Sequence, residues 1–222
     1  MEPSSMPAVE LIVRTIAETA VANEEYFCQL DSVVGDGDFG YSLARGFEKV
    51  LEEFANFDRS SPGAFLKKIG LVIASRVGGT SGPLWGTAFL RAGAAAGAKQ
   101  TLAQADAVVL LRAAVEGIRQ RGGASLGEKT LLDSLVPAID RLEADLAGGA
   151  SDSGVQALAN AAQVAEEAAA ATSSMIAMRG RASYTGERSI GSPDAGAVAI
   201  GVIANRISDA WREFCAQRSK ES

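Results

Sequence analysis

Apolar residues recur at three- and four-residue spacing along almost the whole chain. Ile12 and Ile16 show this spacing near the start, and Leu43, Phe47 and Val50 repeat it further on. Such spacing places apolar side chains on one face of a helix. The alternation of apolar and polar residues that is typical of half-buried strands is almost absent. The pattern therefore predicts an all-α fold.

The helical stretches are separated by glycine, proline and polar residues. We expect about eight helices, which cover residues 9–31, 43–54, 63–77, 84–98, 104–117, 130–142, 155–178 and 197–217. No composition shift marks a domain boundary. We therefore predict a single-domain antiparallel eight-helix bundle over residues 1–222. The small residues of 84–98 predict an especially close approach to a neighbouring helix.

Glycine is concentrated in alternate loops of this predicted bundle. These are the loops at 31–40, 78–82, 122–130 and 179–196. Consecutive helices of an antiparallel bundle lie side by side, so alternate loops gather at the same end. We therefore expect a single functional site at one end of the bundle.

The first of these loops is strongly acidic. Three of its carboxylates, Asp31, Asp36 and Asp38, fall within eight residues. Gathering like charges is costly unless a cation joins them. Carboxylates are hard oxygen ligands, and Mg²⁺ binds such ligands together with water and substrate phosphates. The loop therefore predicts a site for Mg²⁺ and a nucleotide.

Glycines alternate with the acids in this loop. We interpret Gly35, Gly37 and Gly40 as residues that permit turns closed to other side chains and let a phosphate approach the backbone. The helix that follows would offer its free N–H groups to the phosphate.

Two other interpretations of the acidic loop are a hydrated surface turn and a calcium-binding EF-hand. The EF-hand pattern requires ligands at positions one, three and five, with a glutamate at twelve. Here the acids stand at positions one, six and eight, and Ser42 stands at twelve. The EF-hand is therefore the weaker alternative, whereas the hydrated turn stays open.

Composition excludes several functional classes. The chain has 222 residues, a net charge of −6 and no histidine. The charge argues against a nucleic-acid partner, and the missing histidine excludes Ser-His-Asp and zinc-histidine chemistry within the chain. Cys28 and Cys215 form no metal or redox motif. Residues 1–20 lack a signal pattern, and no apolar run is long enough to span a membrane, so we expect a cytoplasmic protein.

Four sequence blocks occur together in a characteristic order. They are DSVVGDGD at 31–38, GGTSGPLWGT at 78–87, GEKTLLD at 127–133, and GRASYTGERSIG at 180–191 with Asp194. In these blocks the chain resembles the nucleotide-binding L subunit of dihydroxyacetone kinase. The resemblance spans nearly the whole chain. It implies an eight-helix, barrel-like bundle with the nucleotide at one end.

The resemblance also implies a ligand set. It assigns two Mg²⁺ ions to the three aspartates and ADP or ATP to a set of cofactor-binding residues. That set is Phe39, Gly40, Tyr41, Ser42, Thr80, Ser81, Gly122, Leu131, Arg181, Asp194, Ala195 and Gly196. It implies no catalytic residue within this chain beyond the metal ligands.

The activity that the resemblance implies is phosphoryl transfer to a short ketose held on a separate K subunit. That subunit captures the sugar through a histidine, which this chain lacks. The resemblance leaves two phosphate donors open, free ATP and a phosphotransferase-system protein. It implies no nucleic-acid or membrane partner.

Two positions depart from the family pattern. Phe39 and Ser192 stand where the family usually has histidines. This departure motivates an alternative, a nucleotide-dependent regulatory module that transfers no phosphoryl group. A purely structural helical protein is a third possibility. For Glu128, Lys129 and Asp133 the simplest interpretation is that they cap and solvate the start of a helix.

Overall fold

The computed structural model describes residues 4–76, 79, 81–148 and 154–221, and these residues form helices and loops without a strand. The α-helices are α1 (Met6–Ala22), α2 (Glu24–Ser32), α3 (Phe39–Glu53), α4 (Pro62–Arg76), α5 (Ser81–Ala96), α6 (Gln104–Gly122), α7 (Leu132–Ala147), α8 (Val155–Ala171) and α9 (Ala195–Glu221). The short 3₁₀ helices are η1 (Phe54–Asn56), η2 (Thr172–Ser174) and η3 (Arg181–Ser189). The all-α prediction is confirmed.

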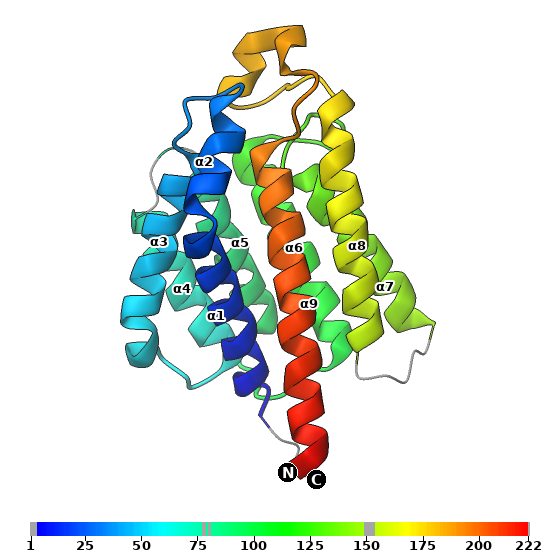
Figure 1. Cartoon of the computed structure of the whole chain (residues 1–222). Helices are drawn as coiled ribbons and strands as arrows, with labels where there is room; N and C mark the ends of the chain where they lie inside the picture. Colours follow the sequence, from blue (N-terminus) through cyan, green and yellow to red (C-terminus); the bar gives the residue numbers. More distant parts are fainter. Residues whose placement is uncertain (1–3, 77–78, 80, 149–153, 222) are drawn as a thin grey trace.

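The helices form a closed ring (Figure 1). From α3 to α9 each helix packs against the next in chain order, and α1 packs against both α3 and α9. The ring confirms the barrel-like bundle. The short helix α2 continues beyond α1 at the upper end of the ring, where it contacts α3 and α9.

Glycines bring α4 and α5 close together. A Cβ added at Gly70 would lie 2.8 Å from the Gly86 carbonyl oxygen, and one added at Gly93 would lie 2.8 Å from the Gly63 carbonyl oxygen. Real Cβ atoms do not approach an oxygen so closely, so these positions exclude larger residues. The close approach predicted for the small-residue stretch 84–98 is confirmed.

Aromatic rings fill much of the core. Phe27, Phe47 and Phe65 are fully buried, and Phe47 packs edge-on against Trp85 and Phe89. Burying one such ring contributes roughly 1.5–3 kcal/mol to the free energy of unfolding. Phe27 comes from α2 and Phe47 from α3, so the core itself holds the two helices that flank the acidic loop.

Two predicted helices extend past residues that interrupt them. The first predicted helix is interrupted at Asn23, whose side-chain amide donates to the Thr19 carbonyl oxygen at 2.8 Å and competes with the helical pattern. The seventh predicted helix, 155–178, corresponds to α8 and ends at Ala171, because Thr172 turns its hydroxyl back onto the Ala169 carbonyl oxygen. The irregular segment predicted at 179–196 contains the 3₁₀ helix η3.

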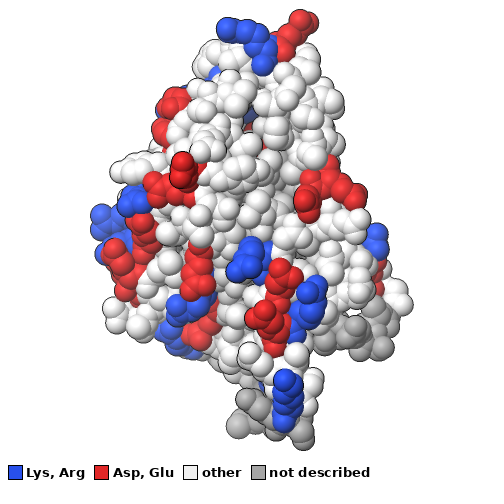
Figure 2. All heavy atoms as spheres, viewed as in Figure 1, with Lys and Arg blue, Asp and Glu red and all other residues white. Residues whose placement is uncertain are grey.

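The glycine-rich loops lie at one end of the ring. Figure 1 shows the α2–α3 loop, the α6–α7 loop and the α8–α9 segment at the upper end, where α4 also ends and α5 begins. On the described part of the face in Figure 2, Lys and Arg lie among Asp and Glu rather than in one continuous positive surface. Within the described ranges, no helix has the length and apolarity needed to cross a membrane.

Candidate nucleotide and metal site

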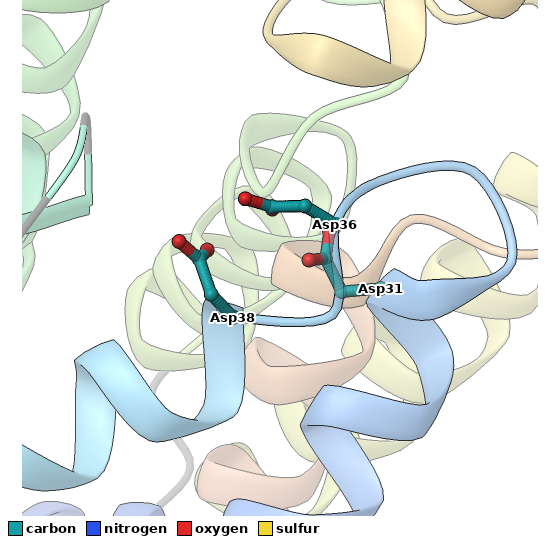
Figure 3. A group of neighbouring side chains, drawn as sticks. All are labelled: Asp31, Asp36 and Asp38. Atoms are coloured by element: carbon teal, nitrogen blue, oxygen red, sulfur yellow. The ribbon is translucent and has the colours of Figure 1, made fainter.

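Three carboxylates converge at the upper end of the ring. Asp31 comes from the last turn of α2, Asp36 from the loop, and Asp38 directly precedes α3. One carboxylate oxygen from each residue lies within 4.8 Å of the other two, and Figure 3 shows Asp36 above Asp31 and Asp38 to the left of both. Asp36 and Asp38 are exposed, and Asp31 is half-buried. The predicted carboxylate cluster therefore exists in the folded chain.

The loop backbone fixes the orientation of Asp31. The Gly37 amide donates to Asp31 Oδ2 at 2.9 Å, and the Gly35 amide donates to the Asp31 carbonyl oxygen at 2.6 Å. A Cβ added at Gly35 would overlap the Asp31 carboxylate. Gly37 has a φ of +75°, in the left-handed region that favours glycine. The two glycines thus hold the Asp31 carboxylate in place beside the other two.

The first turn of α3 leaves two amides open beside these carboxylates. The Ser42 amide donates to the Asp38 carbonyl oxygen at 2.9 Å, and the Tyr41 amide donates to Cys28 Sγ at 3.2 Å. No acceptor within the described residues takes the amides of Phe39 and Gly40. These two amides therefore have no acceptor in the described part of the chain, whereas the Tyr41 amide is already occupied.

The side chains of this turn serve different purposes. The Phe39 ring packs against Phe27 in the core, with the ring centroids 6.1 Å apart. Tyr41 is exposed and lies beside the Arg45 guanidinium. The Ser42 hydroxyl is half-buried at the same helix end. Phe39 therefore offers its backbone, and not its ring, to a ligand.

Arg181 lies against the acidic cluster. It forms an ion pair with Asp36, and its Nη1 lies 3.6 Å from Asp38 Oδ2. Arg181 begins η3, in the segment between α8 and α9 that covers this end of the ring. The structure thus brings a positive charge from the far end of the sequence onto two of the three carboxylates.

Asp194 closes the opposite side of the site as the N-cap of α9. Its Oδ2 accepts the Ala197 amide hydrogen at 2.7 Å. Part of the residue reaches the surface, but protein atoms surround its carboxylate. Burial, with a smaller contribution from the Asp133 and Asp31 charges, raises the pKa of Asp194 to about 6, although the Ala197 amide and the Lys129 charge oppose the shift.

Apolar contacts join the remaining predicted residues. A Cβ added at Gly196 would lie 3.2 Å from Leu131 Cβ, so α7 and α9 begin next to each other. A Cβ at Gly122 would lie 3.1 Å from Leu84 Cδ2 of α5. Ala195 starts α9 beside Asp194, and Ser81 starts α5. Thr80 lies outside the described residues, as does Gly78.

Comparison with known proteins places the chain in a family. Residues 33–209 match the DAK2 domain. The chain belongs to the DAK2 domain family. It is 39% identical over 189 residues to the ADP-binding subunit DhaL of the PEP-dependent dihydroxyacetone kinase of Escherichia coli, covering 85% of this chain and 89% of that protein. A PTS-dependent counterpart from Lactococcus lactis is 37% identical over 176 residues, covering 78% of this chain and 81% of that one.

Longer proteins contain the same domain. A D-erythrulose kinase of Mycolicibacterium smegmatis is 35% identical over 199 residues, which are 87% of this chain but 33% of that kinase. The crystal structure of the dihydroxyacetone kinase of C. freundii superposes with a TM-score of 0.70 at 24% identity, covering 94% of this chain and 35% of that one. The chain therefore spans about a third of these longer proteins, and the structural likeness supports the fold.

In this DAK2 domain, the α6–α7 loop contains one buried residue whose burial was not predicted from the sequence. Lys129 is 2% exposed, and its Nζ donates to three main-chain carbonyl oxygens. Burial lowers the pKa of this ammonium group, and the Asp194 carboxylate opposes the shift. The prediction that Lys129 solvates a helix start is therefore wrong. A lysine in a polar, glycine-containing loop carries no local signal of burial.

The neighbours of Lys129 have other roles. Asp133 accepts the amide hydrogens of Gly127 and Thr130, the latter at 2.7 Å, so it holds the loop before α7, whereas the predicted side-chain cap of this helix is not formed. Glu128 forms a bidentate ion pair with Arg179, at 2.7 and 2.9 Å. This ion pair lowers the pKa of Glu128. Glu128 thus anchors the segment that carries Arg181.

Proposed function

We propose that this chain is the nucleotide-binding subunit of a two-component ketose kinase. It would hold ADP or ATP with Mg²⁺ at the upper end of the ring, and a separate K-type subunit would hold the ketose. The observation that carries the proposal is the convergence of Asp31, Asp36 and Asp38 beside the two open amides of α3. The DhaL relatives, which are named as ADP-binding subunits, support it.

The carboxylate cluster fits a divalent cation. Its oxygens are hard ligands at close range, its outer members are exposed, and its inner member is fixed by the Gly37 amide. When bound, Mg²⁺ would neutralise charge on the nucleotide phosphates. The family resemblance implies two ions. An AMP-PNP and Mg²⁺ complex of the C. freundii kinase, with a TM-score of 0.68 to this chain, is consistent with this assignment.

The nucleotide would contact three regions of the site. Its phosphates would approach the amides of Phe39 and Gly40 and the hydroxyls of Ser42, Thr80 and Ser81. Its nucleoside would lie near Gly122, Leu131 and the α9 start at Asp194, Ala195 and Gly196. Arg181 would supply positive charge beside the phosphates, because it already lies against the acidic cluster.

Exposed apolar side chains surround the same end of the ring and support a partner subunit there. Tyr184 is 88% exposed on η3, and further large apolar residues are exposed in the neighbouring loops and in the first turn of α3: Val33, Tyr41, Leu126, Ile176, Met178 and Ile190. A gathering of exposed apolar residues is typical of a docking surface. The K-type subunit would dock here, so that its ketose faces the nucleotide.

The phosphate donor is proposed from the relatives of similar length. They are named as subunits of PEP-dependent or PTS-dependent kinases, which favours a phosphotransferase-system protein over free ATP. The acceptor would be a short ketose, since other relatives are named as erythrulose kinases. The chain would act in the cytoplasm, where such donor proteins occur.

Calorimetry and thermal unfolding with MgADP test the nucleotide site. At a ligand concentration of about 100 times Kd, binding should raise the free energy of unfolding by about 2.7 kcal/mol. Asp36→Asn and Asp38→Asn should remove most of this gain, because each weakens the cation site. The matched control Asp209→Asn, in α9, should retain it. Wild-type protein that gains no stability with MgADP would refute the proposal.

A transfer assay tests the kinase role. The chain, a K-type subunit, Mg²⁺ and dihydroxyacetone or erythrulose are mixed with either ATP or phosphoenolpyruvate and the phosphotransferase-system proteins. Formation of ketose phosphate in either mixture supports the proposal and identifies the donor. Confirmed nucleotide binding together with a K-subunit complex, but no product from any short ketose, would favour the regulatory module instead.

A further inference from the structure

Residues 173–192, here called the cap, leave α8 and return to α9 over the acidic cluster (Figure 1). The two arms of the cap are joined at its base. The Gly191 amide donates to the Ser173 carbonyl oxygen at 2.8 Å, and the Ala177 amide donates to Ser189 Oγ at 2.9 Å. The cap is therefore a closed loop whose base is held by its own hydrogen bonds.

Lys129 adds a third connection at this base. Its Nζ donates to the carbonyl oxygens of Met175 at 3.2 Å and Ser192 at 2.7 Å, and also to that of Ser189. An ammonium group has three hydrogens, and all three find an acceptor here. Met175 belongs to the outgoing arm, whereas Ser189 and Ser192 belong to the returning arm. One buried charge from the α6–α7 loop thus links both arms.

The backbone of Lys129 is also unusual. Among the described residues other than glycine, Lys129 alone has a positive φ, at +59°. This conformation costs free energy for a residue with a Cβ and persists where surrounding contacts enforce it. Next to it, the Glu128 carbonyl oxygen accepts the Met178 amide hydrogen at 3.0 Å, and the Glu128 carboxylate pairs with Arg179. The loop is shaped to hold the cap.

We infer that Lys129 is a positioning residue: its ammonium group holds the base of the cap closed and so places Arg181 against Asp36 and Asp38. The inference about cap closure stands on the contacts of Lys129. Its consequence for nucleotide binding rests on the proposed function. The Lys129 ammonium group donates to carbonyl oxygens of the cap and not to the acidic cluster, so it acts through Arg181.

Lys129→Met tests this inference, because methionine keeps an unbranched stem and removes the ammonium group. Without nucleotide, trypsin should cut the variant first at Arg179, Arg181 or Arg188, at least tenfold faster than it cuts the same bonds in wild type. Mass spectrometry identifies the first cut. An unchanged cleavage rate at these three sites in folded Lys129→Met would overturn the inference.

Two further variants separate cap opening from general loss of stability. Ile139→Ala removes a buried side chain of α7 far from the cap, and it should lower Tm without speeding the first cut in the cap. Ser189→Ala removes the hydrogen bond to Ala177 and should speed cleavage of the cap, by less than Lys129→Met does. If Lys129→Met does not fold, Ser189→Ala decides, and an unchanged cleavage rate refutes cap closure.

Nucleotide binding provides the test of action through Arg181. Lys129→Met should raise the Kd for MgADP at least fivefold, and this effect should vanish when Arg181→Ala is already present. A fivefold effect that persists in the Arg181→Ala background would overturn the positioning role. If wild type does not bind MgADP, the proposed function fails, while the cleavage rates without nucleotide still decide whether Lys129 closes the cap.

Discussion

The three glycines of the acidic loop have three different physical roles. Gly37 adopts a positive φ, Gly35 leaves room for the Asp31 carboxylate, and Gly40 lets α3 pack against α2. The sequence predicts turns closed to other side chains at all three, and this is correct for Gly35 and Gly37, whereas Gly40 lies inside α3. Composition identifies the loop, but the atom that each glycine must accommodate belongs to the folded structure.

Asp194 should make stability depend on pH. Its pKa is raised by burial from 3.8 to about 6, so the folded state binds this proton more tightly than the unfolded state does. Between these values the free energy of unfolding should fall as pH rises. Above pH 6, where Asp194 is ionised in the folded state as well, its burial should lower the free energy of unfolding by on the order of 3 kcal/mol. Asp194→Asn should therefore raise Tm at pH 8, and this gain should disappear as pH falls toward 4.

The comparison for Asp194 is thermal unfolding of both proteins, without nucleotide, from pH 4 to pH 8. Asparagine retains an oxygen that can accept the Ala197 amide hydrogen, so the N-cap is preserved. The control Asp209→Asn, on the exposed part of α9, should follow wild type at every pH. A difference in Tm between Asp194→Asn and wild type that stays constant across this range would contradict the assignment.

At the scale of elements, the junction of α2 and α3 positions the site. A Cβ at Gly40 would overlap the Glu24 carbonyl oxygen and lie 2.7 Å from the Cys28 amide nitrogen. Both are backbone atoms of α2, which cannot move away without shifting that helix. Gly40→Ala should therefore lower the free energy of unfolding by about 1–3 kcal/mol or more, measured by urea unfolding, and should weaken MgADP binding.

Gly148→Ala is the matched control for this prediction. Gly148 ends α7 with a φ of −71°, and a Cβ there would lie 3.5 Å from the nearest atom, an ordinary contact distance. Alanine should therefore be tolerated or slightly stabilising. Equal effects of the two substitutions on urea unfolding would show that the α2–α3 contact is less tight than described.

The helix ends show what apolar periodicity does not predict at this scale. The breaks after Ala22 and Ala171 fall inside stretches whose apolar pattern continues. In each case a side chain, of Asn23 or Thr172, bonds a nearby carbonyl oxygen, and the next residues then pack in a new direction. Apolar spacing reports which face is buried, but it does not report where a polar side chain interrupts the helix.

At the scale of the whole molecule, the closed ring gathers distant loops and exposed apolar residues at one end. If this end docks the K-type subunit, Tyr184→Ser should raise the K-subunit concentration needed for half-maximal ketose phosphorylation at least tenfold, or about 1.4 kcal/mol. The thermal stabilisation of the Tyr184→Ser variant by MgADP should equal that of wild type. Titration of the K subunit in the transfer assay measures the concentration needed for half-maximal phosphorylation.

Leu71→Ser serves as the control for the docking surface. Leu71 is 56% exposed on α4, outside the glycine-rich loops of the upper end, so its loss removes a comparable apolar area elsewhere. The K-subunit titration of this variant should match wild type. Equal weakening by both substitutions would indicate that the upper end is not the docking surface.

The sequence by itself determined the helical class, the alternation of glycine-rich loops and the three aspartates of the site. These features depend on residue type and short-range spacing, which periodicity and motif order record directly. Tertiary structure alone decided which α3 amides stay open, that Arg181 lies on Asp36, and that Lys129 and Asp194 are buried. Burial and charge pairing depend on which distant residues surround a group, and only the closed ring brings those residues together.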